Sequence, residues 1–126
     1  MAPKRIFLLI AHNAFRDALA SVLNRVPDLE VVSQASSLAE AVNLEHNIDI
    51  ALVDPSLSDG DGLTVVRQLS SRRNAANTAP IALVLTSSGS DPASFKRALE
   101  AGAVGVFSTA CGFEELVDAI RSHLLL

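Results

Sequence analysis

The sequence predicts an α/β fold in which five strand–helix units alternate along the chain and form a three-layer sandwich around a parallel sheet. Several short runs consist almost entirely of Val, Ile, Leu and Ala, which is typical of strands buried on both faces. Between these runs, apolar residues recur at the spacing of a covered helix face. Such alternation implies right-handed crossovers with helices on both faces, whereas an α+β fold needs a separate run of strands and a closed barrel needs eight units.

Each predicted element rests on its spacing and on the residues that begin or end it. The predicted strands are residues 6–10, 29–33, 48–54, 81–85 and 104–107. The first helix ends at Pro27, and Ser36 and Ser37 are candidate caps of the second. Pro92 begins the fourth helix and Gly102 ends it. The inward residues predicted for the five helices are Phe15, Leu19, Val22, Leu23 and Val26; Leu38, Ala41, Val42 and Leu44; Leu63, Val66 and Leu69; Phe95, Ala98 and Leu99; and Phe113, Leu116, Val117 and Ile120.

Composition limits the class of protein. The 126 residues suit one domain, residues 1–126, and the net charge of −4 argues against a nucleic-acid surface on this chain. The single cysteine, Cys111, cannot form an internal disulfide, so we expect a cytoplasmic protein with a passive thiol. The apolar run at residues 6–11 is too short for a signal peptide, and no segment is long enough to span a membrane.

The candidate site lies where the predicted strands end. With the flavodoxin-like strand order 2-1-3-4-5, ligands bind at the carboxyl ends of strands one and three. The residues that these ends offer are Ile10, Ala11 and His12; Asp54 and Pro55; Thr86 and Ser87; and Ser108 and Thr109. No glycine-rich phosphate loop follows the first strand, and no nucleophile–base pair occurs at the strand ends. We therefore expect neither a nucleotide-binding protein nor a small hydrolase.

Four segments together carry a resemblance to a known family. They are residues 49–54 followed by Gly62 and Leu63, the strand end at Leu85 and Thr86, residues 101–105, and residues 12–16. In this order and spacing the chain resembles the CheY-like receiver domain of bacterial two-component response regulators over essentially its whole length. Residues 12–16 are similar to the NarL/FixJ subclass, whose output domains are of the LuxR type.

The resemblance implies roles for particular positions. In that family an Asp after strand three accepts a phosphoryl group from a histidine kinase, and this position is Asp54 here. The switch hydroxyl falls on Thr86. The acidic pair that holds magnesium falls on Ile10 and Ala11, or on Ala11 and His12 in a register shifted by one. The lysine position falls on Thr109, and the aromatic switch position on Val106.

These departures predict an atypical receiver. Magnesium needs hard oxygen ligands, and phosphoryl transfer depends on cations that neutralise the transferred group. Because neither register supplies the acidic pair and Thr109 replaces the lysine, we expect weak or lost Mg²⁺ binding, no other cofactor and no enzymatic activity. The alternative is that Asp54 is still phosphorylated by a histidine kinase at a rearranged metal site, with help from His12 or loop carboxylates.

Simpler roles remain for several candidates. The simpler role for Asp54 is to cap the turn before Pro55, and that for Thr86 is to end a strand as a β-branched residue. The simpler role for His12 is that of a loop residue. We interpret Asp59 and Asp61 as turn formers that cap the next helix rather than as metal ligands. The basic group Arg67, Arg72 and Arg73 suits a solvated surface. We expect contacts with a partner protein or a homodimer through helix four, strand five and helix five, and DNA binding only through an output domain outside this chain.

Overall fold

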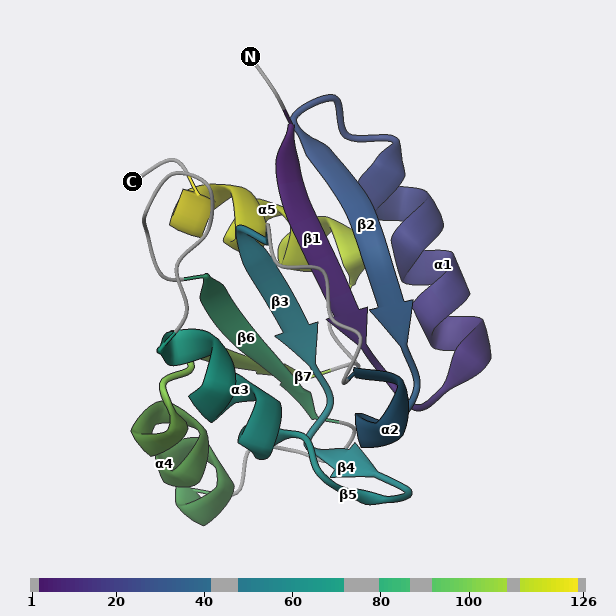
Figure 1. Cartoon of the computed structure of the whole chain (residues 1–126). Coiled ribbons are helices and arrows are strands. Elements are labelled where there is room, and N and C mark those ends of the chain that lie inside the picture. The colour runs from purple at the N-terminus through teal and green to yellow at the C-terminus, as the bar shows by residue number, and fades with distance from the viewer. Residues whose placement is uncertain (1–2, 42–47, 72–79, 87–91, 109–111, 125–126) are drawn as a thin grey trace.

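A parallel five-stranded sheet forms the centre of the computed structural model, which describes residues 3–41, 48–71, 80–86, 92–108 and 112–124 (Figure 1). Its strands are β1 (Lys4–Leu9), β2 (Leu29–Ala35), β3 (Ile50–Val53), β6 (Ile81–Thr86) and β7 (Gly105–Ser108). They lie in the order β2-β1-β3-β6-β7, and all pair in parallel. This is the predicted order 2-1-3-4-5, which confirms the fold class.

Helices cover both faces of the sheet. The helices are α1 (Asn13–Asn24), α2 (Leu38–Ala41), α3 (Leu63–Ser70), α4 (Pro92–Ala101) and α5 (Phe113–Leu124). The apolar residues of α1 and α5 pack on one face, and those of α2, α3 and α4 pack on the other (Figure 1). The predicted three layers are therefore present.

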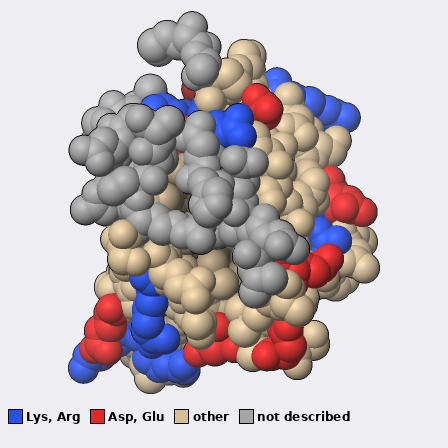
Figure 2. All heavy atoms as spheres, viewed as in Figure 1, with Lys and Arg blue, Asp and Glu red and all other residues tan. Residues whose placement is uncertain are grey.

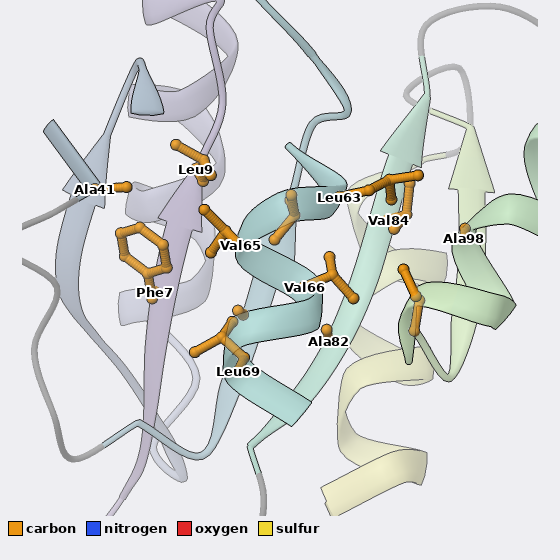
Figure 3. Packing of buried hydrophobic residues seen from close by; sticks show 14 of the residues in the cluster. Phe7, Leu9, Ala41, Leu63, Val65, Val66, Leu69, Ala82, Val84 and Ala98 are labelled. Atoms are coloured by element: carbon orange, nitrogen blue, oxygen red, sulfur yellow. The ribbon is translucent and has the colours of Figure 1, made fainter. Parts of the chain in front are cut away.

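The alternation of side chains along each strand divides the core in two. On β1, Phe7 and Leu9 face the layer of α2 to α4, whereas Ile6 and Leu8 face α1 and α5. Figure 3 shows α3 lying over the first of these faces. The α3 residues that contact it in this cluster include Val65, Val66 and Leu69. Full burial of one such side chain contributes about 1.5–3 kcal/mol, so these two clusters hold the three layers together.

The inward face predicted for α4 is confirmed for Ala98 but wrong for Phe95 and Leu99. Phe95 and Leu99 are 43% and 42% exposed, while Ala98 and Ala101 carry the contact with the core. The helix lies near the edge of the sheet, beside α3 and β7, and small alanine side chains permit this close packing. Periodicity alone does not distinguish a covered stripe from an exposed apolar stripe beside it. Val104, predicted to begin strand five, lies before β7 and is 46% exposed.

The segment after β3 is also more ordered than predicted. No strand was predicted between β3 and α3, but β4 (Ser56–Leu57) and β5 (Gly60–Asp61) form an antiparallel hairpin there. Gly60 has φ +151°, a value that L side chains rarely adopt, which explains a glycine at the start of β5. Smaller differences concern boundaries: β1 ends one residue early, and β2 extends to Ala35.

Candidate functional site

Asp54 lies immediately after β3, and hydrogen bonds hold its backbone and its carboxylate. Its N–H donates to the Leu9 carbonyl at 2.8 Å. Oδ1 accepts the backbone N–H of Ser56 at 2.9 Å, and Oδ2 accepts that of Ala11 at 3.4 Å. The side chain therefore closes the turn after β3 and joins the ends of β1 and β3. The turn-capping interpretation of Asp54 describes this geometry.

The two positions after β1 offer no carboxylate beside Asp54. Ile10 is only 3% exposed and belongs to the apolar cluster under α1 and α5. Its carbonyl oxygen accepts Nη1 of Arg16 at 2.7 Å, while Nη2 of the same guanidinium donates to Oδ1 of Asn13 at 2.8 Å. Arg16 was not predicted as a site residue, because nothing in its spacing indicates that its side chain returns to the end of β1.

His12 begins α1. Its backbone is extended, with φ −78° and ψ 107°, and its Nδ1 accepts the backbone N–H of Phe15 at 3.1 Å. His12 is therefore the N-cap of the helix, a more specific role than the loop residue that the sequence predicted.

Asp59 caps α2, which precedes it in the chain. Its Oδ1 and Oδ2 accept the backbone N–H groups of Leu38 at 2.9 Å and Ala39 at 3.0 Å. These bonds, that from Leu38 first, hold the pKa of Asp59 below its ordinary value because they favour the charged carboxylate. The prediction that Asp59 caps the next helix is thus wrong about which helix it caps.

Asp61 does cap the next helix, as predicted. Its Oδ1 accepts the backbone N–H of Leu63, the first residue of α3, at 2.9 Å. Its Oδ2 accepts Nη2 of Arg97 on α4 at 2.8 Å. In Figure 2 basic and acidic side chains lie next to one another along the lower edge, over α4 and the hairpin. The contact between Asp61 and Arg97 was not predicted because the two residues lie 36 positions apart.

Ser36 and Ser37 form the predicted cap of α2. Ser37 Oγ accepts the backbone N–H of Glu40 at 3.2 Å, and Glu40 Oε1 accepts the N–H of Ser36 at 2.8 Å. The Ser36 hydroxyl also donates to Glu40. The hydrogen bond from this hydroxyl and then that from the Ser36 backbone lower the pKa of Glu40.

The remaining candidates come from the two strands beyond β3. Thr86 ends β6, the neighbour of β3, and pairs in register with Ser108 at the end of β7; both are half-buried. Val106, half-buried on β7, packs against the cluster under α2 to α4. Ser87, Thr109, Cys111, Arg72 and Arg73 lie outside the described residues. The sheet therefore brings Asp54 and Thr86 to the same edge on adjacent strands.

Among the described residues, lysines and metal ligands are sparse at this edge. The lysines of the chain are Lys4, at the opposite end of β1, and Lys96 on α4, which pairs with Glu100 at 3.9 Å. Within the described ranges, no three His, Cys, Asp or Glu side chains are grouped so that they could hold a metal ion. Nor does this part of the chain contain a helix with the length and apolar character needed to cross a membrane.

Comparisons with known proteins agree with this architecture. A family model described as the response regulator receiver domain matches residues 7–121. The transcriptional activator DevR/DosR of Mycobacterium tuberculosis is 34% identical over 119 residues, which cover 93% of this chain and 52% of that protein. LiaR of Bacillus subtilis, a transcriptional regulatory protein, is 32% identical over 120 residues, which cover 94% and 54%. The chain thus spans about half the length of these curated relatives.

A solved structure shares the fold over nearly the whole chain. It is a two-component response regulator of the LuxR family from Aurantimonas sp. SI85-9A1, with a TM-score of 0.83 and 28% sequence identity. The match covers 98% of this chain and 86% of that one. The similarity therefore extends from the central sheet to the surrounding helices.

Proposed function

This chain belongs to the response regulator receiver domain family, which serves two-component signalling and transcription regulation, and on that premise we propose that it works without phosphorylation. It acts as a protein-interaction module whose surface is competent in the unmodified state. The observation that carries this proposal is the environment of Asp54. Both oxygens of its carboxylate accept backbone N–H groups, and the neighbouring positions are Ile10 and Ala11.

The residues at this edge do not fit a magnesium ion. Magnesium needs near-octahedral oxygen ligands and is usually held by one or two carboxylates. Asp59 binds the start of α2, and Asp61 binds α3 and Arg97. A rearranged metal site would have to break these contacts before either carboxylate could join Asp54. The position of the family's lysine is Thr109 here, and that of its aromatic switch residue is Val106. Neither position therefore supplies the side chain that the family uses.

An NMR titration tests the proposal directly. Backbone amide spectra are recorded with millimolar Mg²⁺ and with beryllofluoride, a mimic of the phosphoryl group, and the amides of Asp54, Ser56 and Thr86 are followed. We expect no saturable shifts. Saturable shifts that disappear in Asp54→Asn would instead establish the alternative function, a phosphoacceptor receiver that a histidine kinase modifies on Asp54.

The surface of this module is centred on α4. The large hydrophobic side chains exposed in the described residues are Phe95, Leu99 and Val104, all on α4 or between α4 and β7. Lys96 and Glu100 lie beside the first two, one residue further along α4, and are also exposed. We propose that a second copy of the chain covers this surface, which adjoins β7. In an antiparallel pair of α4 helices, Phe95 meets Leu99 of the other copy and Lys96 meets Glu100, as a two-fold interface requires.

Sedimentation velocity across a concentration series tests this interface. We expect the wild-type chain to self-associate without any phosphoryl donor, and Phe95→Ser and Leu99→Ser to weaken association at least about tenfold, as loss of an apolar anchor does at an interface. Ala18→Ser, at an exposed position of α1 on the other side of the sheet, is the matched control. A wild-type chain that remains monomeric at high concentration would contradict the dimer.

Other partners follow from the family. We propose that DNA is contacted by an output domain rather than by this module, since its net charge is −4 and the DNA-binding relative DevR/DosR is about twice as long. A histidine kinase remains a docking partner rather than a phosphoryl donor. We place the module in the cytoplasm, where the single cysteine, Cys111, needs no partner. We propose no catalytic activity for the chain itself.

A further inference from the structure

We infer that the β4–β5 hairpin couples the Asp54 carboxylate to α4 through the ion pair between Asp61 and Arg97. The hairpin occupies residues 56–61, so one residue, Pro55, separates it from Asp54. One of its ends is tied to the end of β3 and the other to α4. The position of α4, and with it the exposed apolar surface of Phe95 and Leu99, is therefore linked to the state of the strand-end site.

The first link joins Asp54 to the hairpin. Oδ1 of Asp54 accepts the backbone N–H of Ser56, the first residue of β4, at 2.9 Å. Oδ2 meanwhile accepts the N–H of Ala11 at 3.4 Å, which fixes the carboxylate relative to β1. A change in the position or hydrogen bonding of this carboxylate therefore acts on the Ser56 peptide.

The second link crosses the hairpin. Ser56 is the register partner of Asp61, and Leu57 is that of Gly60. The N–H of Gly62 also donates to the carbonyl of Pro55 at 3.1 Å, which closes the base of the hairpin. The two strands are therefore paired in one short unit, in which Ser56 and Asp61 lie opposite each other.

The third link joins the hairpin to α4. Asp61 uses its two oxygens for different helices: Oδ1 accepts the N–H of Leu63 in α3, and Oδ2 accepts Nη2 of Arg97 at 2.8 Å. Because the cap fixes the direction of the carboxylate, the second oxygen is presented to α4 in a defined position. Three contacts thus connect the Asp54 carboxylate to the middle of α4.

This coupling acts in both directions. A partner that shifts α4 changes the hydrogen bonds around Asp54 by the same free energy with which a change at Asp54 shifts α4. The side chains of Arg97 and Asp61 are 61% and 39% exposed, so the pair is weak and the coupling is graded rather than all-or-none. Val106 packs into the core on β7, so the route through the hairpin does not depend on an aromatic side chain there.

Amide hydrogen exchange of the full chain tests the coupling with surface variants that leave the core intact. In Arg97→Gln we expect faster exchange at the amides of Ser56 and Gly62, by about two- to fivefold at low salt, the range that an exposed ion pair supplies. The difference should shrink at 1 M salt, where such pairs are screened. Arg121→Gln is the matched control, because its exposed ion pair with Asp28, at 3.4 Å, involves neither the hairpin nor α4.

A second set of variants tests the route in the other direction. Asp54→Ala should shift the amide resonances of α4 around Ala98 and Leu99, and this effect should be lost in the Arg97→Gln background. Coupling through the hairpin is refuted if Arg97→Gln perturbs α4 alone, if Arg121→Gln changes Ser56 equally, or if the effect of Asp54→Ala on α4 persists without Arg97. Both experiments are carried out at protein concentrations below the onset of self-association in sedimentation velocity, so that they report on α4 in the monomer and stand apart from the tests of dimerisation and of Mg²⁺ binding.

Discussion

Gly62 lies directly against the backbone carbonyl of Asp54. A β-carbon at position 62 would lie 2.2 Å from that oxygen and 3.0 Å from Cγ1 of Val53. The backbone of Gly62 has φ −60° and ψ −21°, which any residue adopts, so the glycine is required by space rather than by conformation. The start of α3 is thus packed against the end of β3, where the candidate site lies.

We predict that Gly62→Ala destabilises the protein by about 1–3 kcal/mol, because the new methyl group must push apart two backbone segments. Gly112→Ala is the control, since a β-carbon there meets nothing within 4 Å. Urea denaturation of both variants measures the difference. Equal free energies of unfolding for the two variants would contradict the close approach.

The lowered pKa of Asp59 predicts a pH dependence of stability. Its ordinary value is 3.8, and the N–H groups of Leu38 and Ala39 lower it in the folded state. The stabilisation is therefore present above about pH 4 and is lost as the pH falls through the folded-state pKa. Asp59→Asn should be less stable than the wild type at pH 6, and the difference between their free energies of unfolding should narrow as the pH falls below about 4.

The measurement is the free energy of unfolding in urea at several pH values. Asp17→Asn, at an exposed position of α1, is the control and should follow the wild-type curve. If the difference in free energy of unfolding between the wild type and Asp59→Asn stays constant with pH, the negative charge of Asp59 does not stabilise the start of α2.

Two leucines in different environments give a matched test of the core. Leu83 on β6 is fully buried, whereas Leu99 on α4 is 42% exposed. Leu83→Ala should cost about 2–5 kcal/mol, because it removes buried methyl groups and leaves a cavity. Leu99→Ala should cost less than about 1 kcal/mol, measured by thermal or urea unfolding at dilute protein. Similar losses of unfolding free energy in the two variants would show that the face of α4 that carries Leu99 is buried rather than exposed to solvent.

The N-cap of α1 can be tested by rescue. His12→Ala removes the acceptor for the N–H of Phe15 and should cost about 0.5–1 kcal/mol. His12→Asn should restore the stability, since asparagine is among the best N-cap residues. If the Asn variant is as unstable as the Ala variant, the imidazole must stabilise the protein through another contact.

The sequence predicted the sheet and the composition of most faces because strand burial and helix spacing are local signals. It placed Asp54 and Thr86 at one edge, since parallel strands end together. It misplaced Phe95 and Leu99, because an apolar stripe at the edge of a sheet has the same spacing whether or not a neighbour covers it. It also assigned Asp59 to the wrong helix, since a side chain can cap any helix end that the fold brings near.

The sequence by itself determined that the strand-end site carries Asp54 without an acidic pair or a lysine, because the identity of the residue at each position is read directly from the sequence. Only the tertiary structure decided what holds Asp54 and what its neighbours do. The contacts of Asp54 with Ala11, of Asp59 with Leu38 and of Asp61 with Arg97 join residues 43, 21 and 36 positions apart. No local pattern encodes such pairs, since they exist only when the sheet order and the packing of α2, α3 and α4 bring distant backbone and side-chain groups within hydrogen-bonding distance.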